Sequence, residues 1–341
     1  MEEKKLYPFR LSGITDSYPW GSEEFLLADL GYRDTFVRGG WLSGNGMGEL
    51  METYLDRMVG DSVFGWYGLQ FPFQLRRISV HGKMPLRVCP PDEHARDIYD
   101  HLGKEKFWYV LHAGKDARLL LGFKDDTPAG AFYSSCLDGS AASLMNVLQP
   151  RDGQYFHIPA GTPHCAWGEI TIVEVSESSA LDFLLCTWGE QAGDEEFDPA
   201  FGLVEALEFI KFDKYPAAYL AGRRLEPRAK DENPLVEKLL RLDQFSVSRI
   251  ALVSALRISS ADSDSCLAYT CLEGEFELQP EGGDSLRFSS GETVLVPAEC
   301  DSFTISPLVQ GTLLLEIMVE PRAGTDPFLP ADDDSLDPAG D

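Results

Sequence analysis

The sequence predicts an all-β protein built from two jelly-roll β-barrels, with helical insertions and an irregular N-terminal segment. Two blocks, Phe71–Ser179 and Phe245–Val319, consist of short apolar and β-branched runs separated by Gly, Pro and Asp. Many short strands with turn signals between them are typical of sandwiches and barrels. Each block also contains a glycine, an apolar strand and a proline in succession, at Gly153–Pro159 and Gly291–Pro297. This repeated sequence pattern indicates two related barrels rather than one continuous sheet.

Changes in composition divide the 341 residues into five predicted regions. Residues 1–65 are rich in Gly and aromatic residues and predict the irregular wrapping segment. Residues 66–190 and 245–322 carry the β-rich blocks and predict the first and second barrels. Residues 191–244 are expected to join them as a helical connector, and residues 323–341 form an acidic tail that is expected to be disordered.

Helices and strands are predicted inside these regions from apolar periodicity and boundary residues. A helix is expected over Asp92–Leu102, because Pro90-Pro91 lies just ahead of it and Gly103 at its end. Further helices are expected within Gly48–Val59, Phe201–Ile210 and Asn233–Arg241. The strands expected in the first barrel are Phe71–Val80, Lys106–His112, Arg118–Phe123, Gln154–Ile158 and Ile170–Val175.

Charge and cysteine usage limit the classes of partner and the compartment. The formal charge of −27 argues against nucleic-acid binding, whose affinity comes mainly from neutralised phosphates, and against docking on anionic membranes. No run of 18 apolar residues occurs, so no membrane-spanning helix is expected. The charged start Met1–Lys5 has no signal-peptide core after it, and the seven cysteines form no CxxC pair. We therefore expect a cytoplasmic protein with reduced thiols.

The strongest local motif is Gly153–His164, which reads Gly, five residues, Pro, any residue, Gly, two residues, His. Gly153 and the corner Pro159–Gly161 turn the chain sharply, so the histidine that follows is expected to point into the mouth of a barrel. This pattern matches the second sequence motif of the cupins, which hold a metal ion at that place.

The surroundings of the motif extend the match to one family. Phe71-Pro72 opens a strand, and near the N-terminus lies Trp20-Gly21. The other matching segments, in chain order, are Leu86–Ala95, Leu102–Leu111, Gly153–His164 and Ile172–Val175. In this order and spacing, over roughly residues 6–320, the chain resembles the class I mannose-6-phosphate isomerases, which are double-cupin proteins.

The resemblance implies an aldose–ketose isomerase that interconverts mannose 6-phosphate and fructose 6-phosphate. A bound Zn²⁺ would polarise the sugar oxygens while a base moves a proton between adjacent carbons. The family holds this metal with a Gln and a His two residues apart, a Glu, and the His of the second motif. In this chain those positions are Arg87, Cys89, Lys106 and His164, so only His164 is retained as a metal ligand.

The positions that the family uses for catalysis are partly retained. A family Lys corresponds to Lys104 and a family Glu to Glu174, and the resemblance implies a catalytic role for both. The family Arg that is thought to act at the sugar falls on Leu184. If a metal is present, Cys89 and Glu174 would be its further candidate ligands beside His164.

The replacements predict that the family's zinc is lost and that no cofactor is bound. Arg87 is always protonated and Lys106 nearly always, so neither can act as a ligand at neutral pH. Side chains alternate along a strand, so Arg87 and Cys89 share a face. At roughly 5 Å and an effective dielectric constant near 20, one such charge would repel Zn²⁺ by several kcal/mol.

The first hypothesis is therefore a mannose-6-phosphate isomerase-like protein that binds a sugar phosphate or another small anion, with isomerase activity lost or weak. Arginine forks and lysine ammonium groups suit phosphate and carboxylate, and an aromatic ring can stack on a sugar. The residues expected to bind the anion are Arg87, Lys104, Lys106 and Trp108, with Arg76 and Arg77 from the preceding strand.

Two alternatives stay open. One is an active isomerase, either with zinc on an altered ligand set or by a metal-free route with Lys104 or Glu174 as the base. That ligand set would be His164, Cys89 and Glu174 together with His157, His94 or His81. The other is a structural protein with a filled pocket, in which the new cations form ion pairs. The pairing expected there joins Arg87 and Lys106 to Glu174, Glu105 or Asp92.

The second barrel gives no sign of a metal site. Residues 245–319 contain no histidine, so a structural or dimer-forming role is expected for this region. The chain also lacks the GxGxxG, Walker A, GxSxG and HExxH patterns of nucleotide-binding proteins, serine hydrolases and zinc proteases.

Overall fold

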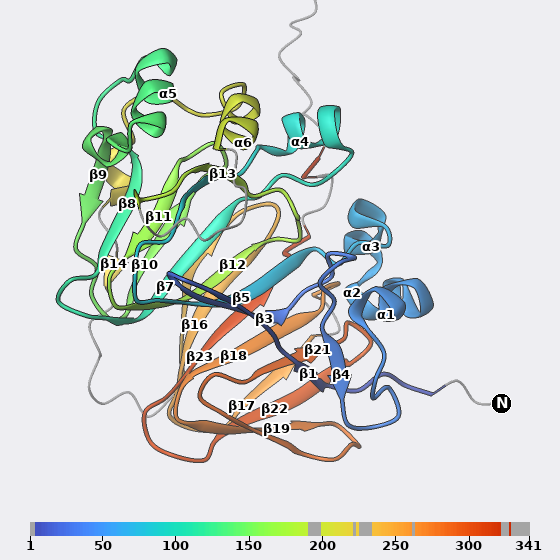
Figure 1. The fold of residues 1–341 in the computed structure, drawn as a ribbon. Helices are drawn as coiled ribbons and strands as arrows, with labels where there is room; N and C mark the ends of the chain where they lie inside the picture. The colour runs from blue at the N-terminus through green and yellow to red at the C-terminus, as the bar shows by residue number, and fades with distance from the viewer. Residues whose placement is uncertain are drawn as a thin grey trace, which may run out of the picture.

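The computed structural model describes residues 4–189, 199–220, 223–224, 234–260, 263–321 and 327–328. Four β-sheets pair into two stacked barrels, one above the other in Figure 1, with short helices at their edges. The predicted all-β fold of two barrels is confirmed. No helix among the described residues is long and apolar enough to cross a membrane. The predicted disorder of the tail concerns residues that, apart from 327–328, lie outside this description.

The first barrel consists of a seven-stranded and a five-stranded antiparallel sheet. The larger sheet runs in the order β14-β10-β7-β12-β5-β3-β2, and the smaller in the order β13-β6-β11-β8-β9. The strands of the larger sheet are β2 (Ile14–Tyr18), β3 (Gly21–Leu27), β5 (Phe73–Val80), β7 (Lys106–Ala113), β10 (Gln154–Ile158), β12 (Ile170–Glu177) and β14 (Arg223–Arg224). Those of the smaller sheet are β6 (Leu86–Val88), β8 (Arg118–Phe123), β9 (Met145–Leu148), β11 (His164–Trp167) and β13 (Phe183–Cys186).

The second barrel repeats this plan with a seven-stranded and a four-stranded sheet, in the orders β15-β16-β23-β18-β21-β1-β4 and β17-β22-β19-β20. The larger sheet contains β1 (Phe9–Ser12), β4 (Phe36–Arg38), β15 (Leu235–Arg241), β16 (Ser246–Leu252), β18 (Leu267–Glu273), β21 (Thr293–Val296) and β23 (Thr312–Met318). The smaller contains β17 (Leu256–Ser259), β19 (Glu275–Pro280), β20 (Leu286–Ser289) and β22 (Ser302–Pro307).

Short helices lie between the strands, and three of the four predicted helical segments contain helices. The helix expected over Asp92–Leu102 is confirmed as α4 (Asp92–Tyr99), which stops at Asp100 in the left-handed conformation. The other helices are α1 (Met47–Tyr54), α2 (Asp56–Val59), α3 (Asp61–Tyr67), α5 (Ala129–Leu137), α6 (Pro199–Ala206) and α7 (Ala217–Leu220), with a 3₁₀ turn at Ala141–Leu144.

Two predictions about secondary structure are wrong. The segment predicted as a helix over Asn233–Arg241 is the edge strand β15, which pairs with β16. Its Leu, Glu, Lys and Arg favour a helix, but pairing with the sheet overrides this propensity. The N-terminal segment is also less irregular than predicted, because β2 and β3 extend the first barrel while β1 and β4 extend the second.

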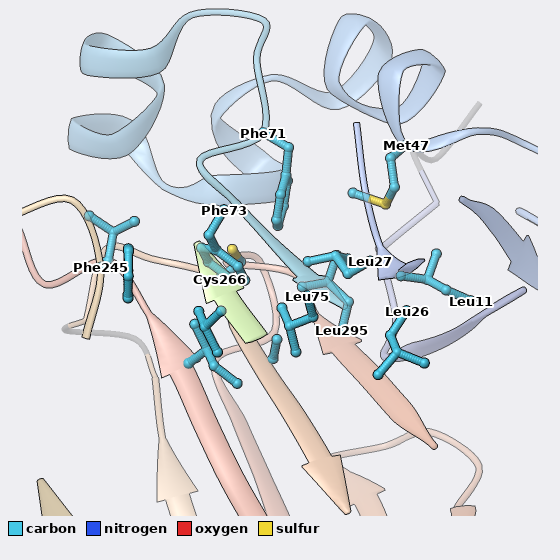
Figure 2. Packing of buried hydrophobic residues seen from close by; sticks show 14 of the residues in the cluster. Leu11, Leu26, Leu27, Met47, Phe71, Phe73, Leu75, Phe245, Cys266 and Leu295 are labelled. Atoms are coloured by element: carbon cyan, nitrogen blue, oxygen red, sulfur yellow. The ribbon is translucent and has the colours of Figure 1, made fainter. Parts of the chain in front are cut away.

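A hydrophobic core lies between the two large sheets and joins the barrels. Phe73 and Leu75 of β5 point toward the second barrel, where Cys266 and Leu295 lie opposite them (Figure 2). Phe245 closes one side of this core. Because alternate residues of β5 face opposite ways, the same strand packs the barrels together with one face and lines the first barrel with the other.

Candidate functional site

A cluster of buried charges occupies the interior of the first barrel. Paired strands bring its members together: Glu174 of β12 lies opposite Arg76 of β5 on one side and Trp108 of β7 on the other. His164 of β11 lies opposite Arg87 of β6. We call the charged members the ion cluster, and they are Glu23, Arg76, Arg87, Lys104, Lys106, Glu174 and Asp182.

Arg76 and Glu174 form the fully buried base of the ion cluster. Arg76 donates from Nε to Glu174 Oε1 at 2.9 Å and from Nη1 to Glu23 Oε2 at 3.0 Å. Trp108 Nε1 donates to the other Glu174 oxygen at 2.7 Å. Burial alone would raise the pKa of Glu174, but the charges of Arg76 and Lys106 hold it at about 2. Glu174 is therefore a permanent anion.

Lys106 projects its ammonium group among the residues that surround the family's metal position. Its Nζ lies 3.0 Å from His164 Nε2, 3.2 Å from Asp182 Oδ2 and 3.8 Å from Glu174 Oε2. Burial disfavours the charge on Lys106, but Asp182 and Glu174 more than offset this effect, so its pKa is raised. The residue is only 1% exposed and carries a positive charge that water does not reach.

His164 Nε2 accepts a hydrogen bond from the Lys106 ammonium instead of donating its lone pair to a metal. Its Nδ1 lies 2.9 Å from the carbonyl oxygen of Thr162, which fixes the proton on Nδ1 and leaves the lone pair on Nε2. Burial and the charge of Lys106 lower the pKa of His164 to about 3, so the ring is neutral. The lone pair that would bind a metal is therefore directed at the Lys106 ammonium.

Arg87 lies at the more open side of the ion cluster, where its side chain is 13% exposed. Its Nη1 is 2.6 Å from Glu23 Oε1 and 3.8 Å from Asp182 Oδ2. The guanidinium group also lies over the ring of Trp20 at 5.5 Å, and Tyr18 stacks on Trp20 at 4.9 Å. An arginine and two aromatic rings thus meet at this side of the barrel.

Asp182 and Glu23 were not identified from the sequence. Asp182, just before β13, bridges Lys106 to Arg76 at 3.4 Å and to Arg87. Burial would raise its pKa, but Lys106 and the other cations around it hold that pKa well below its usual value. The charge balance could have pointed to them. Glu174 alone cannot neutralise the three cations Arg87, Lys104 and Lys106, so further carboxylates had to lie nearby.

Lys104 is the member of the ion cluster that lacks a direct ion pair among the described residues, and Cys89 lies beside the cluster. Lys104 is 2% exposed and forms no direct ion pair with any described residue. Burial lowers the pKa of Lys104, with Asp182 opposing the shift. Burial raises the pKa of Cys89 to about 12, and its thiol lies 3.5 Å from Asp182 Oδ1. Cys89 is therefore a neutral thiol.

These residues do not fit a divalent cation as they are arranged. Cys89, His164 and Asp182 each offer one donor atom, and these atoms lie within 4.8 Å of one another, the one such group among the described residues. The Lys106 ammonium lies among them, within hydrogen-bonding distance of two of the three. A metal ion would meet this positive charge at close range and a thiol that holds its proton.

Several residues proposed for the site lie elsewhere. His157 pairs with Glu105 at 2.6 Å, His94 packs on Phe209, and His81 is exposed at a turn, so none of these histidines reaches His164.

The ion-pair partners expected for Arg87 and Lys106 were only partly correct. Lys106 does pair with Glu174, but Glu105 and Asp92 contact neither cation. Glu105, the residue before β7, is engaged with His157 instead. Trp108 is fully buried, with its indole bonded to Glu174, and this packing favours a core role over stacking on a sugar ring.

Comparisons with known proteins converge on one family. The family model "Mannose-6-phosphate isomerase, cupin domain" matches residues 236–314. The probable mannose-6-phosphate isomerase GmuF of Bacillus subtilis is 22% identical over 76% of this chain and 80% of its own length. The mannose-6-phosphate isomerase ManA of the same organism is also 22% identical, over 79% of this chain and 81% of its own.

Solved structures share the whole architecture. The crystal structure of mannose 6-phosphate isomerase from Bacillus subtilis superposes with a TM-score of 0.75 at 17% identity, covering 92% of this chain and 99% of that one. This likeness extends through both barrels and the N-terminal strands. The family model and the curated relatives support a member of the phosphomannose isomerase and cupin family, and the solved structures show that the chain shares their fold.

Proposed function

We propose that this protein is a metal-independent member of its family that binds a sugar phosphate or a similar small anion in the first barrel, with isomerase activity lost or weak. The observation that carries the proposal is the position of Lys106, whose ammonium group lies between His164, Asp182 and Glu174. A fixed cation in this place neutralises the carboxylates that would otherwise attract a metal ion.

The charge balance of the ion cluster supports anion binding. The cluster contains four cationic side chains and three carboxylates, so it has an excess of one positive charge if all seven are ionised. Lys104 has no direct ion pair among the described residues, and an isolated buried ammonium is costly. A phosphate or carboxylate group near Lys104 and Arg87 would supply the missing negative charge.

The same geometry accounts for weak turnover. Isomerisation requires a base with a pKa near the working pH and a group that polarises the sugar oxygens. Glu174, with a pKa of about 2, is a poor base at neutral pH, and the N–H groups of Lys106 are already directed at acceptors of the protein. Lys104, whose pKa is lowered by burial, is the better candidate for a residual proton transfer.

Metal analysis and a coupled assay test the loss of activity directly. We expect purified protein to contain far less than one equivalent of metal, and mannose 6-phosphate to turn over no faster than in the enzyme-free blank. About one equivalent of Zn, Mn or Fe, or turnover well above that blank, would overturn the proposal in favour of the isomerase alternative.

Thermal shift with mannose 6-phosphate and fructose 6-phosphate tests the binding. Saturable stabilisation is expected, and Arg87→Gln should weaken it at least tenfold because a charged donor is lost at the open side of the cluster. Lys214→Gln is the matched control, since Lys214 is an exposed lysine of the same barrel, and it should bind as the parent does. No stabilisation by either sugar phosphate would favour the filled-pocket alternative.

A cytoplasmic location is part of the same proposal. All seven cysteines are unpaired in the structure, and six of them are buried. Free buried thiols are typical of proteins in reducing compartments.

A further inference from the structure

A second cationic site lies at the seam between the barrels, outside the ion cluster. A cavity of about 110 Å³ opens there, and its lining includes Arg10, Arg38, Glu24, Glu292 and Thr293. Strands β3 and β5 separate this cavity from the ion cluster: Glu23 and Arg76 face the barrel interior, and their neighbours Glu24 and Arg77 face the other way. We call this space the seam cavity.

Two arginines face each other at the seam cavity. Arg10 of β1 lies directly opposite Arg38 of β4 in the antiparallel pair. Like charges in this position destabilise a sheet. Arg38 is exposed and forms no ion pair with any described residue. Glu292 lies 3.6 Å from Arg10, so the arginine pair is only partly neutralised, and the charge of Arg38 stays without an ion pair among the described residues.

Arg10 is held in place but keeps an unused donor. Its guanidinium group lies over the Phe288 ring at 4.6 Å, and its Nη1 is 3.6 Å from Glu292 Oε1, beyond hydrogen-bonding distance. The Nε atom of Arg10 is buried and has no hydrogen-bond partner in the structure. Glu292 is drawn away from Arg10, because its Oε2 accepts from the amide of Ser289 at 2.8 Å.

A third guanidinium group reaches the seam from the first barrel. Arg77 of β5 pairs with Glu24 and passes directly over Gly291. A Cβ atom on Gly291 would lie 2.5 Å from Arg77 Nη1, and Gly291 has a φ of +87°, so only glycine suits this position. The turn that carries Gly291 and Glu292, just before β21, therefore lies against the arginine.

We propose that the seam cavity binds a small tetrahedral oxyanion such as phosphate, between Arg10 and Arg38 and next to Arg77. The three guanidinium groups outnumber the two carboxylates, Glu24 and Glu292, by one charge. Guanidinium forks match the oxygens of phosphate, which would accept from the unused Arg10 Nε and from Arg38. Because Arg10 and Arg38 belong to the second barrel and Arg77 to the first, the bound anion would join the two barrels.

Titration with inorganic phosphate at constant ionic strength tests this site in the full chain. Calorimetry and thermal shift should show saturable binding and stabilisation that chloride at equal ionic strength does not give. Arg38→Gln should weaken phosphate binding at least tenfold, and Arg38→Lys should weaken it less, because a charge remains without the fork. Arg257→Gln, an exposed arginine of the second barrel that is paired with Glu281, is the matched control and should bind normally.

The unliganded variants supply an independent readout. Without phosphate, Arg38→Gln should melt at the same temperature as the parent or higher, since the repulsion between Arg10 and Arg38 is relieved. Arg87→Gln should keep this phosphate binding, which separates the seam cavity from the ion cluster. The proposal is overturned if phosphate acts no differently from chloride, or if Arg38→Gln binds phosphate as tightly as the parent.

Discussion

The two barrels share one architecture but enclose different interiors. The first barrel buries the ion cluster, in which every charge except that of Lys104 contacts an opposite one. The interior of the second barrel is a hydrocarbon core that includes Ile250, Phe276, Leu278 and Phe288. The family model matches residues 236–314, in the second barrel, where the described residues form no such cluster. The fold is thus supported by apolar packing in one barrel, and by mutual neutralisation of charges in the other.

The comparison implies that the two interiors respond differently to substitution. Loss of one apolar group leaves a cavity whose cost depends on its size. Loss of one charge from the ion cluster leaves its partners buried and uncompensated, although the group removed contributes little net stability by itself. Four predictions test this difference, from the largest expected effect to the smallest.

Glu174→Gln should lower the free energy of unfolding by about 3–5 kcal/mol, because Arg76 and Lys106 would lose their shared buried counterion. Urea denaturation of parent and variant measures the change. Ile305→Val, a small truncation at a fully buried position of the second barrel, should cost only about 1 kcal/mol. Equal losses for the two variants would contradict the contrast between the barrels.

Leu278→Ala should cost about 3 kcal/mol of stability through the cavity that it leaves among the apolar side chains of the second barrel. It should leave the affinity of the first barrel for sugar phosphates unchanged, because Leu278 lies outside the ion cluster. Denaturation and thermal shift check the two expectations separately. A tenfold loss of ligand affinity in this variant would show that the barrels are coupled.

Glu177→Gln should stabilise the protein by about 1–2 kcal/mol at neutral pH. Burial raises the pKa of Glu177 well above its usual value, with repulsion from Asp92 and Glu105 adding to the shift. A raised folded-state pKa means that the folded state binds the proton more tightly, so the contribution of Glu177 is lost as the pH rises through that pKa. Stability curves of parent and variant should therefore converge below about pH 4 and separate as the pH rises, and parallel curves would contradict this assignment.

Lys214→Ala should change stability by less than about 0.5 kcal/mol. Its ion pair with Asp125 is 3.4 Å long, but both side chains are largely exposed. Denaturation in low and high salt should give nearly the same small difference. A loss comparable to that of Glu174→Gln would mean that burial does not explain the sensitivity of the ion cluster.

Much of the fold could be predicted from local patterns. Strands β8 and β10 begin and end at the predicted residues, because Gly, Pro and Asp mark their ends in the sequence. The edge strand β15 could not be predicted, since its composition favours a helix and only its pairing with β16 makes it a strand. The contributions of β1–β4 to both barrels likewise depend on contacts between distant segments.

The candidate site was predicted only in part, because it too depends on contacts between residues far apart in the sequence. The family resemblance implied that Arg87, Lys106 and His164 lie around one position, and the structure brings these three residues together. The counterions Glu23 and Asp182 lie 64 and 76 residues from the cations that they contact, Arg87 and Lys106. The register of the sheets decides which carboxylate meets which cation, and no local pattern reveals that register.

The position of Lys106 has one more consequence, for how the barrel obtains its central charge. A metal ion must be acquired from the surroundings, and it can be removed by chelators or exchanged for another metal. The ammonium group of Lys106 is part of the polypeptide, so it is present in every molecule as soon as the chain has been synthesised. The positive charge at the centre of the first barrel is therefore encoded in the sequence, and under the proposed function it needs no supply of zinc.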